Sequence, residues 1–423
     1  MRIWLSTIGQ RLDHADNTRT MLLARFLLDA GHEVLLWTSA YDHIRKQWRT
    51  EYADRKNDVW LMEGGLEVRF MKGCGYRYNV GIRRLVDHIL AASDFRRQAA
   101  QLAPPDVVVA SLPDHITAAA VVDYAKKAGA AAIIDVRDKW PDIFIDYAPS
   151  LLKPLVRLGL LSESRRARRG LQQADALVAM MGSMLDWGLA KAGREKAADD
   201  RIFYLATTPR ADAESAPMSD LSPANQALMS SVAGKTVFTF IGTYNRTQHP
   251  MLVLEAFAQL AKRKDFNADK VAVLIGGDGV DSNLVDQKIS ELPFAHKLGW
   301  LKPPEMRSIL VRSSVGMLPM NFSSPAFNNK AFAYLACGIP IINGASGDLA
   351  DLIDRENVGI NVTAGDASSF ADAAECLIAD PAQIEEKKHR TRALFAASFD
   401  QDKIYSDYVA HIIAIAERRR SQS

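Results

Sequence analysis

Short apolar runs alternate with helical patterns along the first half of the chain. Residues 2–8 form an apolar run, residues 18–30 carry apolar side chains at helical spacing, and residues 33–38 form the next run. A strand, a helix and a second strand in this order predict a parallel βαβ unit. Further buried strands are predicted over residues 106–111 and 131–136. We therefore predict a doubly wound α/β sheet in this half.

A stretch rich in Pro, Ala, Ser and Asp interrupts the alternation at residues 206–233, and we interpret it as a linker. The alternation restarts with the apolar run at residues 236–241. We predict two Rossmann-like domains, residues 1–205 and residues 234–400, and a last amphipathic helix over residues 400–418.

Composition and charge exclude several classes of protein. The net charge of the 423 residues is +2, which gives no support to nucleic-acid binding. The three cysteines are too widely spaced for a disulfide framework or a metal site. No apolar run has the length of a membrane span, and the first residues lack the apolar region of a signal peptide. We therefore expect a cytoplasmic protein.

Ligands of open parallel sheets bind beyond the carboxyl ends of the strands, so the loops at those ends hold the candidate residues. In the second half, Asn329 and Lys330 stand at the start of a short predicted helix. The helix dipole disfavours a cation in the first turn unless an anion binds at the same place. We predict an anion site here; the alternative is that Lys330 points into water.

A second loop of this half, Gly242 to Arg246, also precedes a helix. A glycine lets the backbone approach an anion closely, and Arg246 can pair with it bidentately. Together with Lys330, this loop is typical of a diphosphate site, although a surface arginine and ordinary turn glycines remain the alternative. Gly277 lies in a third loop, IGGDGV, where glycine serves either a ligand or a positive φ.

Three loops of the first half are candidates as well. One runs from Gly9 to Arg19. In the second, Asp114 and His115 follow a buried strand, and His115 is either structural or a donor to a substrate oxygen. The third, RDKWPD, places Arg137, Asp138 and Trp140 at a strand end, where packing alone does not explain so dense a group.

Leucines and arginines interleave over residues 151–169. Such a basic amphipathic segment can lie on an anionic membrane. A solvated helix face against the core is the alternative.

Two tandem Rossmann-like halves, a linker and a terminal helix resemble the GT-B glycosyltransferase architecture. The sequence is similar to bacterial family 4 glycosyltransferases of capsule and O-antigen synthesis, over nearly the whole chain. The most specific pieces are GHEVLLWTSAYDH, DVRDKWPD, FIGTYNR, and NNKAFAYLACGIPII followed by SGDLADLI. The resemblance implies a nucleotide-sugar donor in the second half, an acceptor in the first, and a terminal helix, residues 401–423, that crosses back to the first half.

The resemblance also assigns roles by position. The residues predicted to be catalytic are His115, Asp138, Arg246 and Lys330. The residues predicted to bind the donor, with Trp300 and Leu301 beside the nucleobase, are Gly242, Thr243, Asn245, Arg246, Gly277, Trp300, Leu301, Asn329, Lys330 and Asp348. The residues predicted to bind the acceptor are Gly9, Arg19, Asp114, Arg137 and Trp140.

One part of the family pattern is missing. The family has two glutamates at the places that hold Pro325 and Ala333 here, and neither side chain can accept a hydrogen bond from a hydroxyl. Asp348 occupies a later acidic position and can compensate in part. The resemblance implies sugar transfer, with retention and without a metal, from a UDP- or GDP-sugar to a lipid-linked or surface-polysaccharide glycan, at the inner face of the membrane if residues 151–169 bind there. The alternatives are a non-catalytic nucleotide-sugar-binding or scaffolding subunit and a sugar-nucleotide epimerase, whose proton-transfer pair the sequence does not identify.

Overall fold

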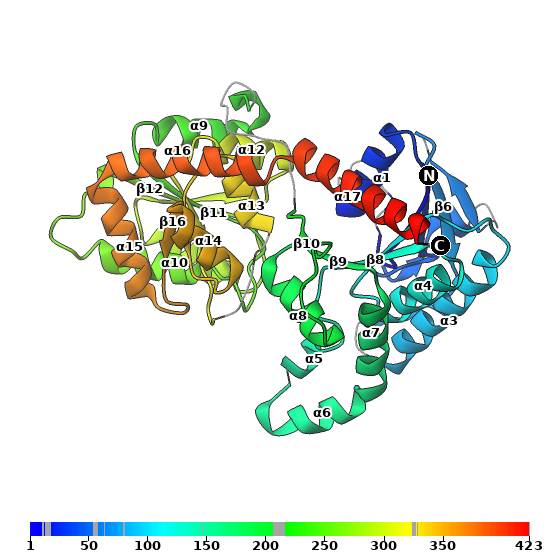
Figure 1. The fold of residues 1–423 in the computed structure, drawn as a ribbon. Coiled ribbons are helices and arrows are strands. Elements are labelled where there is room, and N and C mark those ends of the chain that lie inside the picture. Colours follow the sequence, from blue (N-terminus) through cyan, green and yellow to red (C-terminus); the bar gives the residue numbers. More distant parts are fainter. Residues whose placement is uncertain are drawn as a thin grey trace. The chain divides into compact units, whose positions relative to one another are not determined.

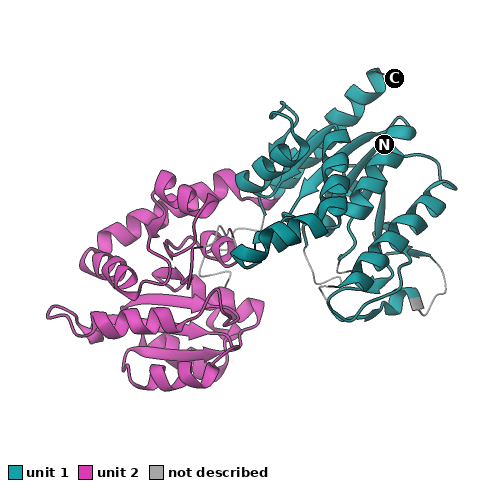
Figure 2. Cartoon of the chain, turned by 90° about the horizontal axis from the view of Figure 1, so that it is seen from below, with its two compact units in different colours: residues 1–205, 402–423 teal, residues 206–401 magenta. Residues whose placement is uncertain are grey.

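The chain divides into two compact units (Figures 1 and 2). Unit 1 comprises Met1–Leu205 and Asp402–Ser423, and unit 2 comprises Ala206–Gln401. The computed structural model describes residues 1–10, 12, 18–53, 58–62, 64–78, 81–146, 148–205, 216–323, 327 and 329–422. Each unit is built around its own sheet, so each is described by itself.

The described part of unit 1 holds an eight-stranded sheet in the order β10-β9-β8-β7-β1-β2-β6-β5. All pairs are parallel except β5 with β6. The strands are β1 Arg2–Ser6, β2 Glu33–Ser39, β5 Val59–Leu61, β6 Glu67–Met71, β7 Val107–Ser111, β8 Ala131–Val136, β9 Ala176–Ala179 and β10 Arg201–Ile202. A hairpin of β3 Tyr41–Asp42 and β4 Gln47–Trp48 lies outside the sheet.

Helices cover both faces of this sheet, as the buried residues of its central strands require. Its helical elements are α1 Arg19–Asp29, α2 Thr50–Ala53, α3 Ile82–Ala99, α4 His115–Lys127, α5 Ile143–Asp146, η1 Ser150–Leu152, α6 Lys153–Gly159, α7 Leu161–Gln173 and α8 Gly182–Ala192. Figure 1 shows α3, α4 and α7 side by side on one face. Trp4, Trp37 and Phe95 pack edge to face in the core beneath them.

The last helix, α17 (Gln401–Ser421), packs on unit 1 beside α1. Tyr405 and Tyr408 are fully buried, and Tyr408 stacks on Phe203 with ring centres 4.3 Å apart. The imidazole of His411 bonds the carbonyl of Asp199 at 3.0 Å. The helix is thus part of the core of unit 1.

Unit 2 holds a parallel six-stranded sheet in the order β13-β12-β11-β14-β15-β16, again within the described residues. The strands are β11 Thr236–Ile241, β12 Val271–Gly276, β13 Ala295–Gly299, β14 Val315–Leu318, β15 Ile341–Asn343 and β16 Gly359–Asn361. The helical elements are η2 Met218–Asp220, α9 Pro223–Ser231, α10 Met251–Leu260, η3 Ala268–Lys270, α11 Ser282–Ser290, α12 Pro303–Leu310, α13 Asn329–Ala336, α14 Asp348–Glu356, α15 Ala367–Ala379 and α16 Pro381–Ser398.

The predicted fold class, two Rossmann-like sheets with a C-terminal helix, is confirmed. The sequence pattern missed β13, because this edge strand reads AHKLG and carries two polar side chains in place of an apolar run. It also missed β5, which has no buried side chain. Among the described residues, no helix is both long and apolar enough to cross a membrane.

Candidate functional site

In unit 2, backbone hydrogen bonds connect the loop after β11 to the loop after β12. The amide of Gly242 donates to the carbonyl of Gly276 at 3.0 Å, and the amide of Tyr244 donates to that of Asp278 at 2.9 Å. Gly277 has φ +118°, and a Cβ there would lie 2.0 Å from the carbonyl oxygen of Gly242. A side chain at residue 277 would therefore separate the two loops, so this glycine serves the packing between them.

Lys330 extends from the first turn of α13 onto this pair of loops. A Cβ on Gly242 would lie 2.0 Å from Lys330 Cε, so the side chain fills the space that the glycine leaves. Its Nζ donates to Oε1 of Gln248 at 2.6 Å and lies 4.6 Å from the centre of the Phe240 ring. Burial lowers the pKa of Lys330 to about 8. No carboxylate among the described residues forms an ion pair with this ammonium, which suits it to bind an anionic ligand.

The other residues predicted to bind the donor occupy more open positions. Asn245 shapes its own turn, because its Oδ1 accepts from the amides of Thr247 and Gln248, each at 2.9 Å. Leu301 packs beneath Gly276, with Cδ1 3.2 Å from where a Cβ would stand. Solvent-exposed residues of this group are Thr243, Asn245, Arg246, Trp300 and Asn329.

Helix α13 begins at Asn329, and Ala333 lies within it. Asp348 is the first residue of α14. Pro325 lies outside the described residues. The structure thus brings together Gly242, Gly277 and Lys330. It adds Gln248, which no sequence motif marked.

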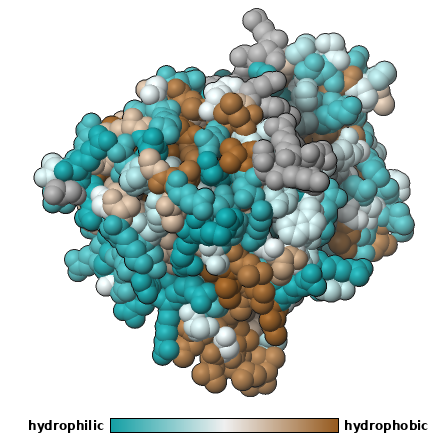
Figure 3. Space-filling view, turned by 90° about the vertical axis from the view of Figure 1, so that its right-hand side faces the viewer, coloured by the Kyte–Doolittle hydropathy of each residue, from teal (hydrophilic) through white to brown (hydrophobic). Residues whose placement is uncertain are grey.

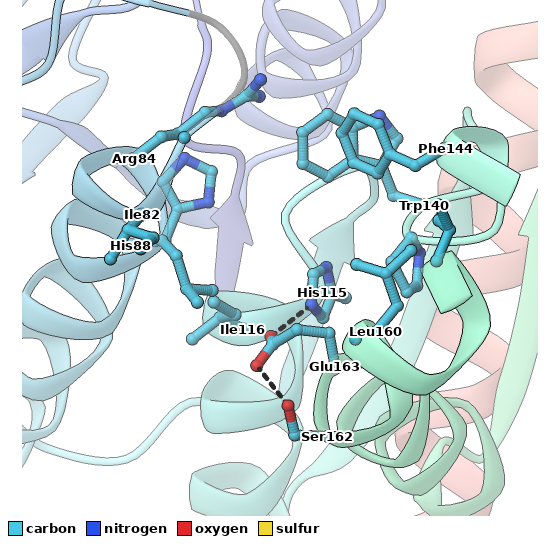
Figure 4. A pocket seen from close by; sticks show the side chains of 15 residues that line it. Ile82, Arg84, His88, His115, Ile116, Trp140, Phe144, Leu160, Ser162 and Glu163 are labelled. Carbon is cyan, nitrogen blue, oxygen red and sulfur yellow. Dashed lines mark hydrogen bonds and ion pairs between the residues drawn. The ribbon is translucent and has the colours of Figure 1, made fainter. Parts of the chain in front are cut away.

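Unit 1 contains an open, mainly apolar cavity of about 520 Å³. Figure 4 shows Trp140 and Phe144 on one side of it and Arg84 and His88 on the other. The Arg84 guanidinium stacks on the Trp140 ring at 4.2 Å. The apolar lining consists of Ile82, Leu85, Ile116, Trp140, Pro141, Phe144, Val156 and Leu160. Its size and lining suit a ligand with an apolar part.

A buried histidine–carboxylate pair lies in the wall of this cavity. His115 Nε2 is 2.8 Å from Glu163 Oε2, and both side chains are buried (Figure 4). The hydrogen bond from His115 lowers the pKa of Glu163. Asp114 caps α4 by accepting from two backbone amides, which fixes His115 at the first helical position. The Nδ1 of His115 is buried and has no hydrogen-bond partner among the described groups.

The predicted loop RDKWPD supplies groups to two places. Trp140 lines the apolar cavity, and burial raises the pKa of the nearby Asp138. Arg137 donates to Asp135 at 2.8 Å and lines a second cavity of about 380 Å³. This second cavity also brings together Gly9 and Asp114, and its further lining includes Thr7, Gln10, Thr18, His43, Arg84 and Ser111.

The structure gives Arg19 a structural role in place of the predicted acceptor contact. Its guanidinium is buried, pairs with Asp135 at 2.9 Å and donates to the carbonyls of Phe203 and Tyr204. It also lies 5.2 Å from the ring centre of Tyr408. Through these contacts the side chain of Arg19 connects α1 with β8 and α17.

The segment of residues 151–169 presents leucines to solvent. Leu151 is 94% exposed, and Leu155 and Leu158 are 67% and 69% exposed. Figure 3 shows a brown hydrophobic area at the lower end of the molecule, where Figure 1 places α6. Arginines exposed on the same segment are Arg157, Arg165, Arg168 and Arg169. We call residues 151–161 the leucine patch.

Part of the chain is similar to known glycosyltransferases. Residues 235–380 match the family model "Glycosyl transferases group 1". A D-inositol 3-phosphate glycosyltransferase of Gordonia bronchialis is 25% identical over 44% of this chain and 42% of its own length. An N-acetyl-alpha-D-glucosaminyl L-malate synthase of Bacillus anthracis is 24% identical over 41% of this chain and 44% of its own length. The chain thus spans less than half the length of the curated relatives it matches.

Solved structures match the fold over the whole chain. Anabaena HepE in complex with UDP superposes with a TM-score of 0.66 at 14% identity, over 98% of this chain and 99% of that one. Sucrose-phosphate synthase of Thermosynechococcus elongatus superposes with a TM-score of 0.69 at 15% identity, over the full length of both chains. The chain therefore has the GT-B fold, and its residues 235–380 are similar to the group 1 glycosyl transferases.

Proposed function

We propose that this protein transfers a sugar, with retention, from a nucleoside diphosphate sugar to a hydroxyl of a lipid-linked glycan. The observation that carries the proposal is the apolar cavity of unit 1, which places the His115–Glu163 pair among aromatic and aliphatic walls. Such a site accommodates a polar group and an apolar chain of one ligand.

The donor is assigned to unit 2. Lys330 and the backbone of the Gly242 loop provide a cation and a close approach for a diphosphate. A nucleoside diphosphate sugar is the donor class that the group 1 match supports. Solved structures of similar fold were obtained with UDP and UDP-glucose, so UDP-sugars are the first donors to test, and GDP-sugars the second.

The chemistry requires no strong protein base. The bond between the anomeric carbon and the diphosphate oxygen breaks, and the acceptor oxygen bonds to that carbon on the same face. The departing diphosphate oxygen takes the acceptor proton. Lys330, together with the exposed Arg246, stabilises the charge that develops on the diphosphate. His115 holds a donor or acceptor hydroxyl from the wall of its cavity.

The lipid-linked acceptor is supported by the leucine patch. Val156 and Leu160 of this segment line the cavity, while Leu155 and Leu158 face solvent. The segment therefore offers an apolar cavity lining and an apolar surface together. The exposed arginines of residues 157–169 suit the anionic headgroups at the inner face of a membrane.

The test is a turnover assay of the full chain with UDP- and GDP-sugars and a polyprenyl-diphosphate glycan in detergent. We expect nucleotide release that depends on the acceptor, a glycosylated product by mass spectrometry, and an unchanged anomeric configuration by NMR. Lys330→Ala should abolish turnover, whereas Lys264→Ala, an exposed lysine of the same unit, should not. Donor binding without turnover on any lipid-linked acceptor would instead favour a non-catalytic nucleotide-sugar-binding subunit.

A further inference from the structure

Two histidines and a carboxylate converge beside the apolar cavity and the second cavity described above. His43 follows the short strand β3, whereas Asp87 and His88 are neighbours on α3. One ligand atom of each residue lies within 4.8 Å of the others. Asp87 and His88 are buried, and His43 is half-buried. Residues from separate segments are thus brought to one point inside the unit.

On each of the three side chains, one polar atom is within hydrogen-bond distance of another protein group. His88 Nδ1 lies 3.2 Å from Asp114 Oδ1. Asp87 Oδ1 accepts from the amides of Cys74 and Gly75, each at 2.7 Å. His43 Nδ1 contacts the hydroxyl of Tyr76. An outer partner on the second nitrogen or oxygen is the arrangement that orients metal ligands in proteins.

The opposite polar atom of each side chain is buried and has no hydrogen-bond partner among the described groups. These atoms are His43 Nε2, His88 Nε2 and Asp87 Oδ2. Because Asp114 can only accept, the proton of His88 resides on Nδ1, and Nε2 presents a lone pair. The Tyr76 hydroxyl can accept from His43 Nδ1, and in the tautomer that donates this bond His43 Nε2 also presents a lone pair. With His43 in that tautomer, each of the three side chains carries a buried lone pair without a donor, and a cation bound among them would satisfy all three.

Charged groups of both signs surround the three side chains, so the case for a cation rests on the unpartnered ligand atoms. Asp87 and Asp114 contribute two negative charges. Lys46 and Arg84 lie against the Tyr76 ring, at 4.5 and 5.6 Å from its centre, and oppose them. Two imidazoles and one carboxylate suit a transition metal, whereas Mg²⁺ and Ca²⁺ favour oxygen ligands alone.

We propose that His43, Asp87 and His88 bind one divalent transition-metal ion of the zinc class. Ligands of a tetrahedral zinc site lie about 3.4 Å apart, so binding draws the three side chains together by about 1 Å. His88 lines the apolar cavity and His43 lines the second cavity, so the proposed site borders both. The metal site is independent of the proposed sugar transfer.

The experiment is a calorimetric titration of the EDTA-treated, dialysed full chain with ZnCl₂, followed by metal analysis and thermal unfolding. We expect one Zn²⁺ per chain and a rise in Tm on binding. His88→Asn and His43→Asn keep a nitrogen near the place of Nδ1 but remove Nε2. Asp87→Asn keeps an oxygen for the backbone amides but removes the charge. Each should weaken binding by more than about 100-fold, the upper range for loss of an outer partner alone.

His389→Asn is the matched control, because this histidine is exposed in unit 2. It should bind Zn²⁺ as the unchanged chain does. Failure of the unchanged chain to bind one Zn²⁺ would overturn the proposal, as would equal binding by the His88→Asn and Asp87→Asn variants. Because neither donor nor acceptor is present, this result stands apart from the turnover assay.

Discussion

The ammonium of Lys330 lies 2.6 Å from the amide oxygen of Gln248 and against the backbone of Gly242, where burial lowers its pKa to about 8. A neutral amide stabilises an ammonium less than a carboxylate does. In the proposed donor site, the charge of this ammonium should therefore control the affinity for the diphosphate.

Affinity for UDP should consequently fall as the pH rises. Below about pH 8 the ammonium is charged in the free protein, and above it the amine is neutral, so the dissociation constant should increase between about pH 7 and pH 9. Calorimetry across this range measures the change. Lys330→Met should bind weakly at every pH; a parallel pH dependence in this variant would assign the titration to another group.

The lowered pKa of Lys330 also affects the stability of unit 2. Whereas UDP affinity should fall as the pH rises, this stability should increase. The unfolded chain binds a proton at Lys330 up to about pH 10.4, while the folded chain loses it near pH 8. Between these values the unfolded state binds more protons, so this residue makes unit 2 more stable as the pH rises. Chemical unfolding without ligand should show this contribution disappear in Lys330→Met.

The His115–Glu163 pair gives a prediction about turnover. His115→Ala should lower kcat by about tenfold, because it removes a hydrogen bond to a substrate hydroxyl, which contributes about 0.5–1.5 kcal/mol. Glu163→Gln keeps a hydrogen-bond acceptor but removes the charge that faces Nε2, so its loss should be smaller. Steady-state kinetics with saturating donor measure both. Glu195→Gln, an exposed glutamate of unit 1, is the control, and equal kcat in all variants would contradict the assignment.

The sequence pattern predicted that Gly242 and Lys330 lie at one edge of a sheet, but it did not predict the walls of the unit 1 cavity. Gly242 and Lys330 follow strands of one parallel sheet, so the chain order already places them at the same edge. Glu163 lies 48 residues from its partner His115 on a different helix, and no spacing within either segment marks the pair. The same holds for Arg84 and His88, whose helix reads as an ordinary amphipathic one. Only a pattern shared between distant segments, such as covariation, could have identified them.

Arg19 shows why a strand-end position alone is a weak guide. Its guanidinium is turned into the core by Asp135, a residue that the sequence pattern marks only as part of an apolar strand. Arg19→Met should keep the packing of the side chain but leave the buried carboxylate of Asp135 with Arg137 alone. Removing one partner of a buried pair costs about 3–5 kcal/mol.

Urea unfolding followed by tryptophan fluorescence tests this loss, since all tryptophans except Trp300 belong to unit 1. The double variant Arg19→Met/Asp135→Asn should recover part of the stability, because it no longer leaves an unpaired charge. Arg165→Met, at an exposed position, should change the midpoint little. A single Arg19 variant as stable as the unchanged chain would show that the pair contributes nothing.

The leucine patch gives a prediction that separates membrane contact from catalysis. Leu155 and Leu158 expose 67% and 69% of their surface, and burying such a side chain in lipid contributes about 1.5–3 kcal/mol. Leu155→Asp/Leu158→Asp should therefore reduce flotation of the protein with anionic liposomes by at least tenfold while leaving UDP binding unchanged. Leu61→Asp is the matched control, because Leu61 is 67% exposed on β5 of the same unit. If both variants float as the unchanged chain does, the exposed leucines serve some other contact. If only the patch variant stays in solution, residues 151–161 hold the protein at the membrane surface, where lipid-linked acceptors are found.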